Sequence, residues 1–234
     1  MKRKILFAAI SISICSLGLT LGFYYNKSQI LYKQSICQTK YLLEYEKEKE
    51  KQIRLDNMSR SLIIAFSISK WEAKYYSIIF DDFSQAYDIP WEIYACVFRI
   101  ESNFLTTLIS KSGAKGIGQL LESTAKELCE RLDIQYVNSQ TLWNDLLNMI
   151  LSCYYLSEGV CDSAYKDSSI DCKLIHGVRR YLGGPSYHIN VKKNKQINNY
   201  VMDYKTTVWK EYNKLKFIYK GVVADDKKEI ILFF

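Results

Sequence analysis

Residues 5–26 form an apolar run that carries no charge and follows the basic segment 1–4. At about 1.5 Å per residue, a helix of this length crosses a hydrocarbon core of about 30 Å. Tyr24 and Tyr25 stand where an interfacial aromatic belt is expected. Basic residues ahead of such a run keep the N-terminus in the cytoplasm. The run therefore predicts a single-pass transmembrane helix, with the rest of the chain outside the cytoplasmic membrane.

A cleaved signal peptide is the main alternative for this run, and it gives the same location in the cell envelope. Signal peptides have a shorter apolar core and end in a small-residue exit. The triplets at 16–18 and 20–22 are poor exits, so an uncleaved signal anchor is favoured. A helix buried in the core of a soluble protein is a third interpretation.

Few residues in the chain interrupt helices, because Pro occurs twice and Gly ten times among 234 residues. This scarcity favours a mainly α fold over a β-sandwich, which needs many turns. With two His and no CxxC motif, the sequence predicts neither a metal site nor another cofactor. The net charge of +7 is too modest to indicate a nucleic-acid partner by itself.

The cysteines are compatible with export. Of the seven, Cys15 lies in the apolar run, and the others permit disulfides in an exported domain. Cys161 and Cys172 flank a polar stretch and are the favoured pair. Cys96 lies on an apolar helix face and is predicted to be a free, packed thiol.

The rest of the chain divides into three parts. Residues 27–74 are predicted as a juxtamembrane helical stalk, because Glu and Lys alternate at helical neighbour spacing within 42–56. Residues 75–204 contain the motifs described next. Residues 205–234 form a basic, aromatic tail, either a solvated helix face or a binder of anionic polymers or lipid head groups. The end of the tail, from Phe217, is predicted as a β-hairpin. Apolar positions expected in the core are Leu62, Ile63, Phe66, Ile78, Ile79, Phe80 and Phe83.

A predicted helix that ends near a single carboxylate carries the clearest catalytic candidate. Asp88 and Pro90 suit a helix start. Apolar residues then follow at spacings of three and four, at 93, 96, 97, 100 and 104. Glu101 lies beside this stripe. A carboxyl group at such an edge loses hydration, which raises its pKa towards the value that a general acid needs near neutral pH. A solvated Glu, or one paired with Arg99 or Lys111, is the alternative.

A glycine-rich loop follows this helix. The segment 110–120, SKSGAKGIGQL, has three Gly within six residues and then the side-chain amide of Gln119. Gly lets a ligand approach the main chain closely, and an amide both donates and accepts hydrogen bonds. The loop thus suits recognition of the acetamido and hydroxyl groups of a sugar. It lacks the Gly-Lys-Ser/Thr ending of a phosphate loop, and a new helix is predicted from Glu122.

The motifs occur in a fixed order over about 75–204. The first are YDIPWEIYACVFRIESNF, SKSGAKGIGQL and STAKEL. Those that follow are Asn148-Met149, Ser152 where Gly is usual, Tyr155-Leu156, RYLGGP at 180–185 and Tyr200-Val201. In this order they resemble the catalytic domain of lytic transglycosylases of the soluble type, which is related in fold to goose-type lysozyme.

The resemblance implies a lysozyme-like helical domain with a groove for a peptidoglycan glycan strand. Glu101 would be the single catalytic acid and base. It would protonate the oxygen that links N-acetylmuramic acid (MurNAc) to N-acetylglucosamine (GlcNAc), and later take a proton from the muramic C6 hydroxyl group. The product would carry a 1,6-anhydro-MurNAc end. Positions that line the family's groove correspond here to Ser110, Gln119, Tyr155 and Tyr181.

Two positions depart from the family pattern. Leu182 stands where Asn is usual, so a polar contact to substrate is expected to be missing. Gly118, counted with the substrate-binding positions, replaces the usual Met and is expected to open the groove or to change its packing on a sugar. Glycosidases with two carboxylates hold them about 5–9.5 Å apart, but neither the loop nor the motif around Tyr181 has a second one. A substrate-assisted mechanism fits that absence.

Three hypotheses on function follow. The first is a membrane-anchored peptidoglycan lytic transglycosylase, with a lysozyme-type muramidase that uses the same Glu101 as its nearest variant. The second is a non-catalytic scaffold that binds glycan or a secretion apparatus. The third is a structural envelope protein held by its stalk and tail. The predicted partners are peptidoglycan strands, the membrane, and envelope or secretion-system proteins.

Overall fold

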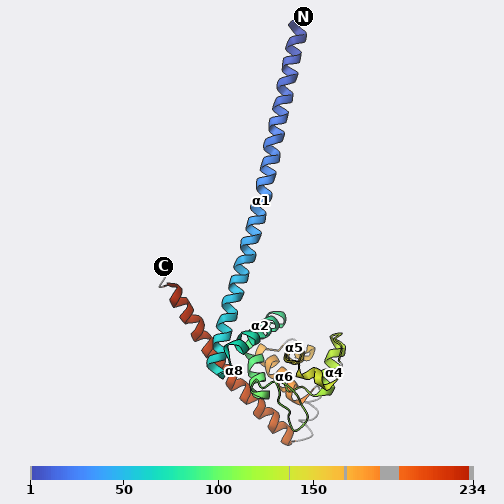
Figure 1. Ribbon diagram of the computed structural model, residues 1–234, viewed down its shortest axis with the longest axis vertical. Helices are drawn as coiled ribbons and strands as arrows, with labels where there is room; N and C mark the ends of the chain where they lie inside the picture. Colours follow the sequence, from blue (N-terminus) through green and yellow to red (C-terminus); the bar gives the residue numbers. More distant parts are fainter. Residues whose placement is uncertain (1, 137, 166–167, 185–194, 232–234) are drawn as a thin grey trace. The chain divides into compact units, whose positions relative to one another are not determined.

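The computed structural model describes residues 2–136, 138–165, 168–184 and 195–231 (Figure 1). Within them, the side chains of 2–16, 195–198, 200–201 and 227–231 lie outside the description. The α-helices are α1 (Lys2–Phe66), α2 (Lys70–Tyr87), α3 (Trp91–Ser102), α4 (Glu122–Arg131), α5 (Asp145–Val160), α6 (Ile170–Gly183) and α8 (Lys195–Ile231). Two short 3₁₀ helices are η1 (Ser139–Trp143) and η2 (Ser163–Tyr165). The described residues form no strand beyond isolated bridges around Lys115, which confirms the mainly α prediction.

The chain separates into two compact units, Met1–Ile53 and Arg54–Phe234. The first unit is helical throughout its described residues, as part of α1. Within the part of the chain that the structure describes, no helix is long and apolar enough to cross a membrane. The predicted span includes residues 5–16, whose side chains lie outside that part.

The second unit begins inside the segment predicted as a stalk. The end of α1 contributes Met58, Leu62 and Phe66 to its core, because these residues recur every fourth position on one helix face. A two-pronged ion pair joins α1 to α2 here: Arg54 Nε and Nη2 donate to Asp81 Oδ1 and Oδ2 across 2.6 and 2.9 Å.

The core positions predicted from periodicity are largely confirmed. Four of them are buried, two are partly buried against the core, and one is exposed. The buried ones are Leu62, Phe66, Ile79 and Phe80, the partly buried ones are Ile63 and Phe83, and the exposed one is Ile78.

The junction between α2 and α3 differs from its prediction in one residue. Asp88 does not begin α3; it ends α2 in the left-handed conformation, with φ of 53°. Pro90 then precedes Trp91 directly, with its fixed φ of −54°, and α3 begins without a side-chain cap. An Asp tolerates the left-handed region better than most residues, which explains why this carboxylate can terminate a helix.

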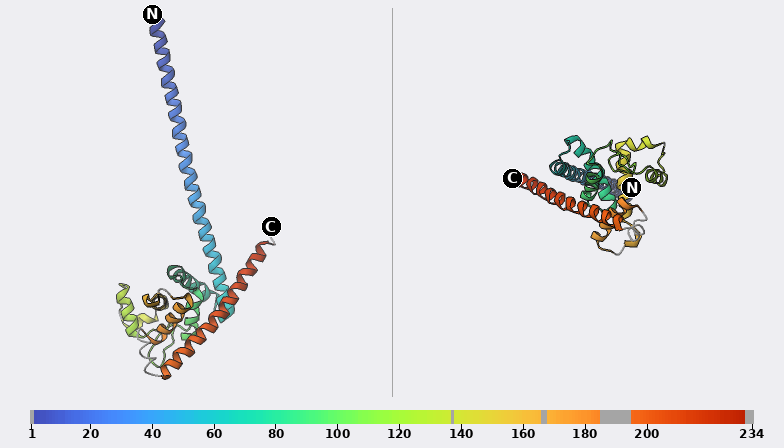
Figure 2. Two further views of the ribbon diagram at one scale, coloured as in Figure 1. Left: turned by 180° about the vertical axis from the view of Figure 1, so that it is seen from behind. Right: turned by 90° about the horizontal axis from the view of Figure 1, so that it is seen from below.

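The C-terminal tail is helical. The β-hairpin predicted after Phe217 is wrong, because α8 runs unbroken from Lys195 to Ile231 (Figure 2). Its buried residues recur at spacings of three, four and seven, and the helix packs on α3 and α6. These buried residues are Tyr204, Val208, Tyr212, Leu215 and Val222. An amphipathic helix of this kind derives its stability from the packed face rather than from propensity.

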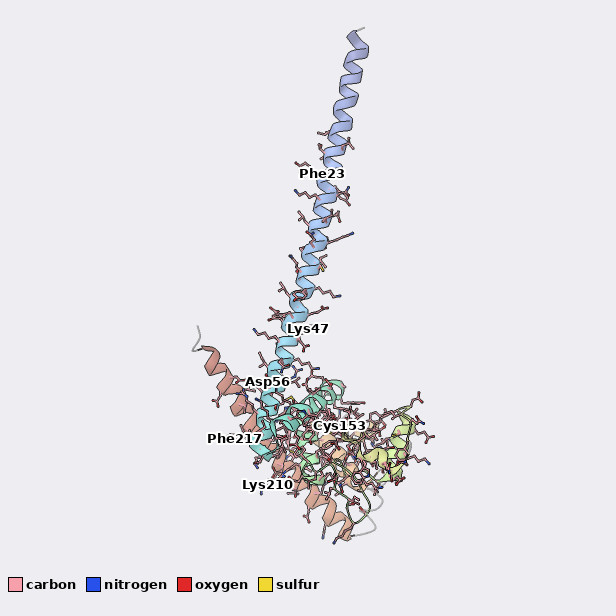
Figure 3. The ribbon with its side chains drawn as sticks, in the orientation of Figure 1. Phe23, Lys47, Asp56, Cys153, Lys210 and Phe217 are labelled. Atoms are coloured by element: carbon pink, nitrogen blue, oxygen red, sulfur yellow. The ribbon has the colours of Figure 1, made fainter. Side chains whose placement is uncertain are left out.

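The cysteines are only partly as predicted. Cys96 is a buried free thiol, as expected, and so is Cys153, which lies among the packed side chains in Figure 3. Cys161 and Cys172 are both free and exposed, so the predicted disulfide between them is wrong. Cys161 caps the end of α5 and Cys172 lies in the first turn of α6. The predicted disulfide rested only on the positions of Cys161 and Cys172 on either side of a polar stretch of the sequence.

Candidate active site

Glu101 lies in the last turn of α3, whose preceding residues are almost all buried. The helix stops there because Asn103 and Phe104 both adopt left-handed backbone conformations, with φ of 55° and 63°. Loss of hydration raises the pKa of Glu101 to about 7. The predicted effect of the helix edge on this carboxyl group is therefore confirmed. The alternative partner Arg99 instead lies over the ring of Phe66, with 5.7 Å from its guanidinium carbon to the ring centre.

Tyr204 on α8 donates a hydrogen bond to Oε1 of Glu101 across 2.5 Å. This bond stabilises the carboxylate and lowers its pKa, but the effect of burial is larger. Tyr204 was not among the site residues predicted from the sequence. The last of the family motifs, Tyr200-Val201, lies one helical turn before Tyr204, and the side chains of Tyr200 and Val201 are outside the described residues. The sequence feature that could have indicated Tyr204 is its spacing of four from Tyr200, which places both residues on one helix face.

The glycine-rich loop is held in a tight turn beside Glu101. Lys115 and Leu120 exchange backbone hydrogen bonds of 2.9 and 3.2 Å. Between them, Gly116 has φ of +77°, and a Cβ there would lie 2.3 Å from Nδ2 of Asn148. Only glycine therefore fits this position. The hydroxyl group of Ser102 donates to the carbonyl of Ile117 across 2.6 Å and ties the loop to the end of α3.

Asn148 on α5 is the main support of the loop from beneath. This fully buried side chain accepts from the N–H of Gly118 across 2.9 Å. Its amide group donates to the carbonyls of Lys115 and Leu142 across 3.0 and 3.1 Å. One side chain thus bonds three backbone groups, of which the Lys115 carbonyl also accepts from the N–H of Leu120.

Gln119 presents an acceptor at the loop's edge. Its backbone is left-handed, with φ of 53°, and its amide nitrogen donates to the carbonyls of Leu108 and Gly116 across 3.0 and 2.8 Å. Within the described residues its carbonyl oxygen forms no hydrogen bond. That oxygen can therefore accept from an acetamido N–H or a sugar hydroxyl group.

A pocket of about 210 Å³ joins these groups. Besides Glu101, its lining comes from the loop, the start of α4, α5 and the end of α6. These residues are Ser110, Ser112, Ala114, Gln119, Leu120, Leu121, Thr124, Tyr155, Tyr181, Leu182 and Gly184. Pockets that enclose a small ligand usually measure about 300–1,000 Å³. The smaller volume suits a site that contacts only part of a long polymer.

Four of the five predicted substrate-binding residues line this pocket with Glu101, namely Ser110, Gln119, Tyr155 and Tyr181. Ser110 has its hydroxyl oxygen engaged by the N–H of Ala114 across 3.0 Å. The rings of Tyr155 and Tyr181 lie 5.5 Å apart. The hydroxyl group of Tyr181 donates to the carbonyl of Gly118 across 2.6 Å. Tyr181 therefore supports the loop in addition to lining the pocket.

Gly118 is the exception, because it is buried and does not line the pocket. The expected opening of the groove at this position is not present. A Cβ at Gly118 would lie 1.9 Å from the hydroxyl oxygen of Ser152 and 3.0 Å from that of Tyr181. Ser152 therefore fills the space that a side chain at Gly118 would need. Leu182, by contrast, does line the pocket and offers it no polar group.

Among the described residues that line the pocket, Glu101 supplies the only carboxylate. Asp133, Asp145 and Asp162 lie elsewhere. Asp162 contacts His176 Nε2 at 3.2 Å, and the backbone N–H of Ala164 is the main cause of its lowered pKa. The described residues also contain no group of His, Cys, Asp and Glu that could hold a metal ion. The arrangement can thus donate and recover a proton at one point beside a polar, aromatic surface.

The sequence matches the family described as Transglycosylase SLT domain over residues 79–199, a range that holds all the motifs described above except the closing Tyr200-Val201. A comparison with curated proteins gives no match. Among solved structures, the chain resembles an inactive mutant of the lytic transglycosylase Slt from Pseudomonas aeruginosa. The identity is 19% and the TM-score 0.44, over 59% of this chain and 24% of that one.

The 70 kDa soluble lytic transglycosylase from Escherichia coli is similar at 17% identity and a TM-score of 0.41, over 74% of this chain and 28% of that one. A complex of the 70 kDa soluble lytic transglycosylase with bulgecin A gives 16% identity and a TM-score of 0.41, over 78% and 30%. The chain thus spans less than a third of the length of each of these structures.

Proposed function

This chain belongs to the transglycosylase SLT domain family, and on that premise we propose that it is a peptidoglycan lytic transglycosylase. It cleaves the β-1,4 bond between MurNAc and GlcNAc and leaves a 1,6-anhydro-MurNAc end. The observation that carries the proposal is a single pocket carboxyl group, Glu101, with its pKa raised to about 7. A group with that pKa is substantially protonated near neutral pH and can act first as acid and then as base.

In the first step, protonated Glu101 donates its proton to the bridging oxygen, and the C1–O bond of MurNAc breaks. The GlcNAc end leaves with a free 4-hydroxyl group. The carbonyl oxygen of the substrate's own acetamido group bonds to C1 and takes up the positive charge as an oxazolinium ring. No protein nucleophile is needed, which agrees with the single carboxylate among the described lining residues.

In the second step, the Glu101 carboxylate accepts the proton of the muramic C6 hydroxyl group. The C6 oxygen attacks C1, the bond from C1 to the acetamido oxygen breaks, and the 1,6-anhydro ring closes. The acetamido group is restored and Glu101 is protonated again. Tyr204 assists the intermediate state, because its hydrogen bond of 2.5 Å stabilises the carboxylate.

The remaining pocket residues position the sugar. The free carbonyl oxygen of Gln119 accepts from the acetamido N–H and so holds that group near C1. The hydroxyl groups of Ser110 and Thr124 offer further hydrogen bonds. Tyr155 and Tyr181 present ring surface to the apolar face of a sugar.

A muramidase differs only in the second step, where water replaces the C6 hydroxyl group and a reducing end forms. The Glu101 carboxylate is the base for either nucleophile, because it is the one carboxylate among the described lining residues. The two products differ in mass by one water, so the chemistry of the ends decides between them.

The test is to incubate the full chain with purified peptidoglycan and to analyse the released fragments by mass spectrometry. We expect 1,6-anhydro ends, and at least about 100-fold less product from Glu101→Gln. Glu130→Gln, which changes an exposed carboxylate on α4, serves as the control and retains activity. Reducing ends would identify a muramidase. A wild-type chain that binds peptidoglycan without cutting it would identify a scaffold.

We also propose that the domain works outside the cytoplasmic membrane. The basic segment 1–4 and the uncharged run 5–26 support this location. A reporter enzyme that is active only after export, fused behind Phe234, tests it by its activity in cells. The N-terminal mass of the mature chain then distinguishes an anchor from a cleaved signal peptide.

A further inference from the structure

Trp71 is a large aromatic side chain that the core does not use. It lies in the first turn of α2, and 72% of its surface is exposed. Single exposed apolar residues are common on protein surfaces. Trp71 differs from these because its indole lies flat on another ring: the centres of Trp71 and Tyr75 are 5.4 Å apart, with 10° between their planes.

This stacking holds the indole in a defined orientation. Tyr75 is packed against the core and touches Tyr76, and Tyr76 stacks on Phe104 at 5.4 Å. A series of rings therefore connects Trp71 to the segment that follows Glu101. One face of the indole stacks on Tyr75, and most of the surface of the Trp71 side chain remains exposed to solvent.

The backbone beneath Trp71 is also fixed. Ser69 and Glu72 form a reciprocal capping box at the start of α2, with hydrogen bonds of 2.9 and 3.2 Å. Such a cap stabilises the first helical turn, to which Trp71 belongs. A ring held by a cap and by a stacked neighbour loses little conformational entropy when a ligand binds.

Two lysines flank the indole on α2. Lys70 and Lys74 are exposed, and neither forms an ion pair with the described residues. The surface made by Lys70, Trp71, Lys74 and Tyr75, named here the α2 platform, thus combines a flat apolar face with two cations. The apolar C–H face of a pyranose ring packs on such an indole, while ammonium groups attract carboxylates.

We propose that the α2 platform is an accessory binding site for an acidic glycan, separate from the catalytic pocket. The proposal rests on the proposed function, because peptidoglycan provides both pyranose rings and the carboxylates of its lactyl and peptide groups. A lipid surface fits less well, because a residue that enters a bilayer projects from its helix, whereas Trp71 lies flat on Tyr75.

The test measures binding of the full chain to insoluble peptidoglycan by co-sedimentation in detergent. The Glu101→Gln background is used so that the polymer stays intact. We expect Trp71→Ala to weaken binding about three- to tenfold, since a ring contact contributes about 0.5–1.5 kcal/mol. Trp71→Tyr restores part of the affinity. The double variant Lys70→Ala with Lys74→Ala weakens binding at low salt and has less effect at high salt.

Matched controls come from α8, where Phe217 is 79% exposed and Lys210 is an exposed cation (Figure 3). Phe217→Ala and Lys210→Ala are expected to bind peptidoglycan like the parent. If Trp71→Ala also binds like the parent, the proposal is overturned. It is likewise overturned if Trp71→Ala reduces binding to anionic phospholipid vesicles and leaves peptidoglycan binding unchanged.

Turnover separates this proposal from the proposed function. Turnover is measured in chains that keep Glu101. There, Trp71→Ala is expected to cut a soluble tetrasaccharide fragment at the wild-type rate and to digest insoluble peptidoglycan more slowly than the wild type. A wild-type chain that cuts neither substrate contradicts the proposed function. The co-sedimentation result then still decides whether the α2 platform binds glycan.

Discussion

The hydroxyl group of Tyr204 donates to Oε1 of Glu101 across 2.5 Å, although the two residues are 103 positions apart in the chain. The bond joins the end of α3 to α8, and among the described residues it is the one effect that lowers the pKa of Glu101 against a larger rise from burial. The protonation of the proposed catalytic acid therefore depends on a helix that follows all the loop motifs of the domain.

Removing this hydroxyl group is expected to move the pH dependence of activity. In Tyr204→Phe the carboxylate loses its hydrogen bond, so the pKa of Glu101 rises further above 7. The protonated, acid-competent form then persists to higher pH. We expect the alkaline limb of the pH–rate profile to shift upward and the maximal rate to fall, because the carboxylate needed in the second step is less stable.

Tyr212→Phe on the same helix is the control, since the hydroxyl group of Tyr212 contacts Lys216 and not the pocket. Its profile should match that of the wild type. An alkaline limb that stays in place, or moves downward, in Tyr204→Phe would contradict the role assigned to Tyr204.

Protein stability is expected to depend on pH through Glu101 itself. The folded state holds its proton up to about pH 7, whereas the ordinary pKa is 4.5. Between these values the folded state binds more protons than the unfolded state, so the free energy of unfolding falls as pH rises. The loss through this group is at most about 3 kcal/mol.

Denaturant unfolding at pH 5 and pH 8 measures this effect. The decrease between the two pH values should be smaller in Glu101→Gln than in the wild type, because the amide does not titrate. Equal decreases in both proteins would show that Glu101 is not the buried titrating group.

The contact between Gly118 and Ser152 predicts a coupled pair of substitutions. In Gly118→Ala the new Cβ would lie 1.9 Å from the hydroxyl oxygen of Ser152 and 2.6 Å from its Cβ. We expect a loss of about 1–3 kcal/mol from overpacking. Adding Ser152→Gly removes both close contacts and should recover much of that loss.

The coupling energy of this double-mutant cycle, taken from thermal or denaturant unfolding, checks the prediction. Gly113→Ala gives a contrast, because a Cβ there meets no atom within 4 Å and only the positive φ of 83° opposes it. Additive effects of Gly118→Ala and Ser152→Gly would mean that the two residues do not share one space.

Substitution of Asn148 should affect the loop before the rest of the fold. Asn148→Ala removes the partner of the Gly118 N–H and of the Leu142 carbonyl, while the Lys115 carbonyl keeps its bond from Leu120. Each buried orphan costs about 1–3 kcal/mol, so we expect at least about 2 kcal/mol of destabilisation. Peptidoglycan cleavage should fall further than stability alone explains, because Gln119 loses its position.

Hydrogen exchange of the loop amides distinguishes local from global loosening. Amides in 115–120 should exchange faster in Asn148→Ala, while those in the middle of α3 keep their protection. Uniformly faster exchange would show instead that Asn148 supports the whole domain. Asn138→Ala, which removes an exposed cap of η1, is a suitable comparison.

Local features of the site could be predicted from the sequence because they depend on neighbours along the chain. The apolar stripe up to position 100 places Glu101 at a helix edge, which predicts the direction of its pKa shift, while the burial that raises the pKa comes from the folded domain. The glycines of 113–118 indicate a tight loop, since positive φ is a property of the residue itself. The same holds for the mainly α class, which follows from helical periodicity and few breakers.

Only the tertiary structure decides which distant side chains meet. The shared helix face of Tyr200 and Tyr204 does not identify Tyr204 as the partner of Glu101, and no local pattern shows that Ser152 fills the space beside Gly118. The free state of Cys161 and Cys172, and the helix where a hairpin was predicted, likewise depend on how α5, α6 and α8 pack. Periodicity specifies which face of a helix is apolar, but the partner of that face is determined by the packing of the whole domain.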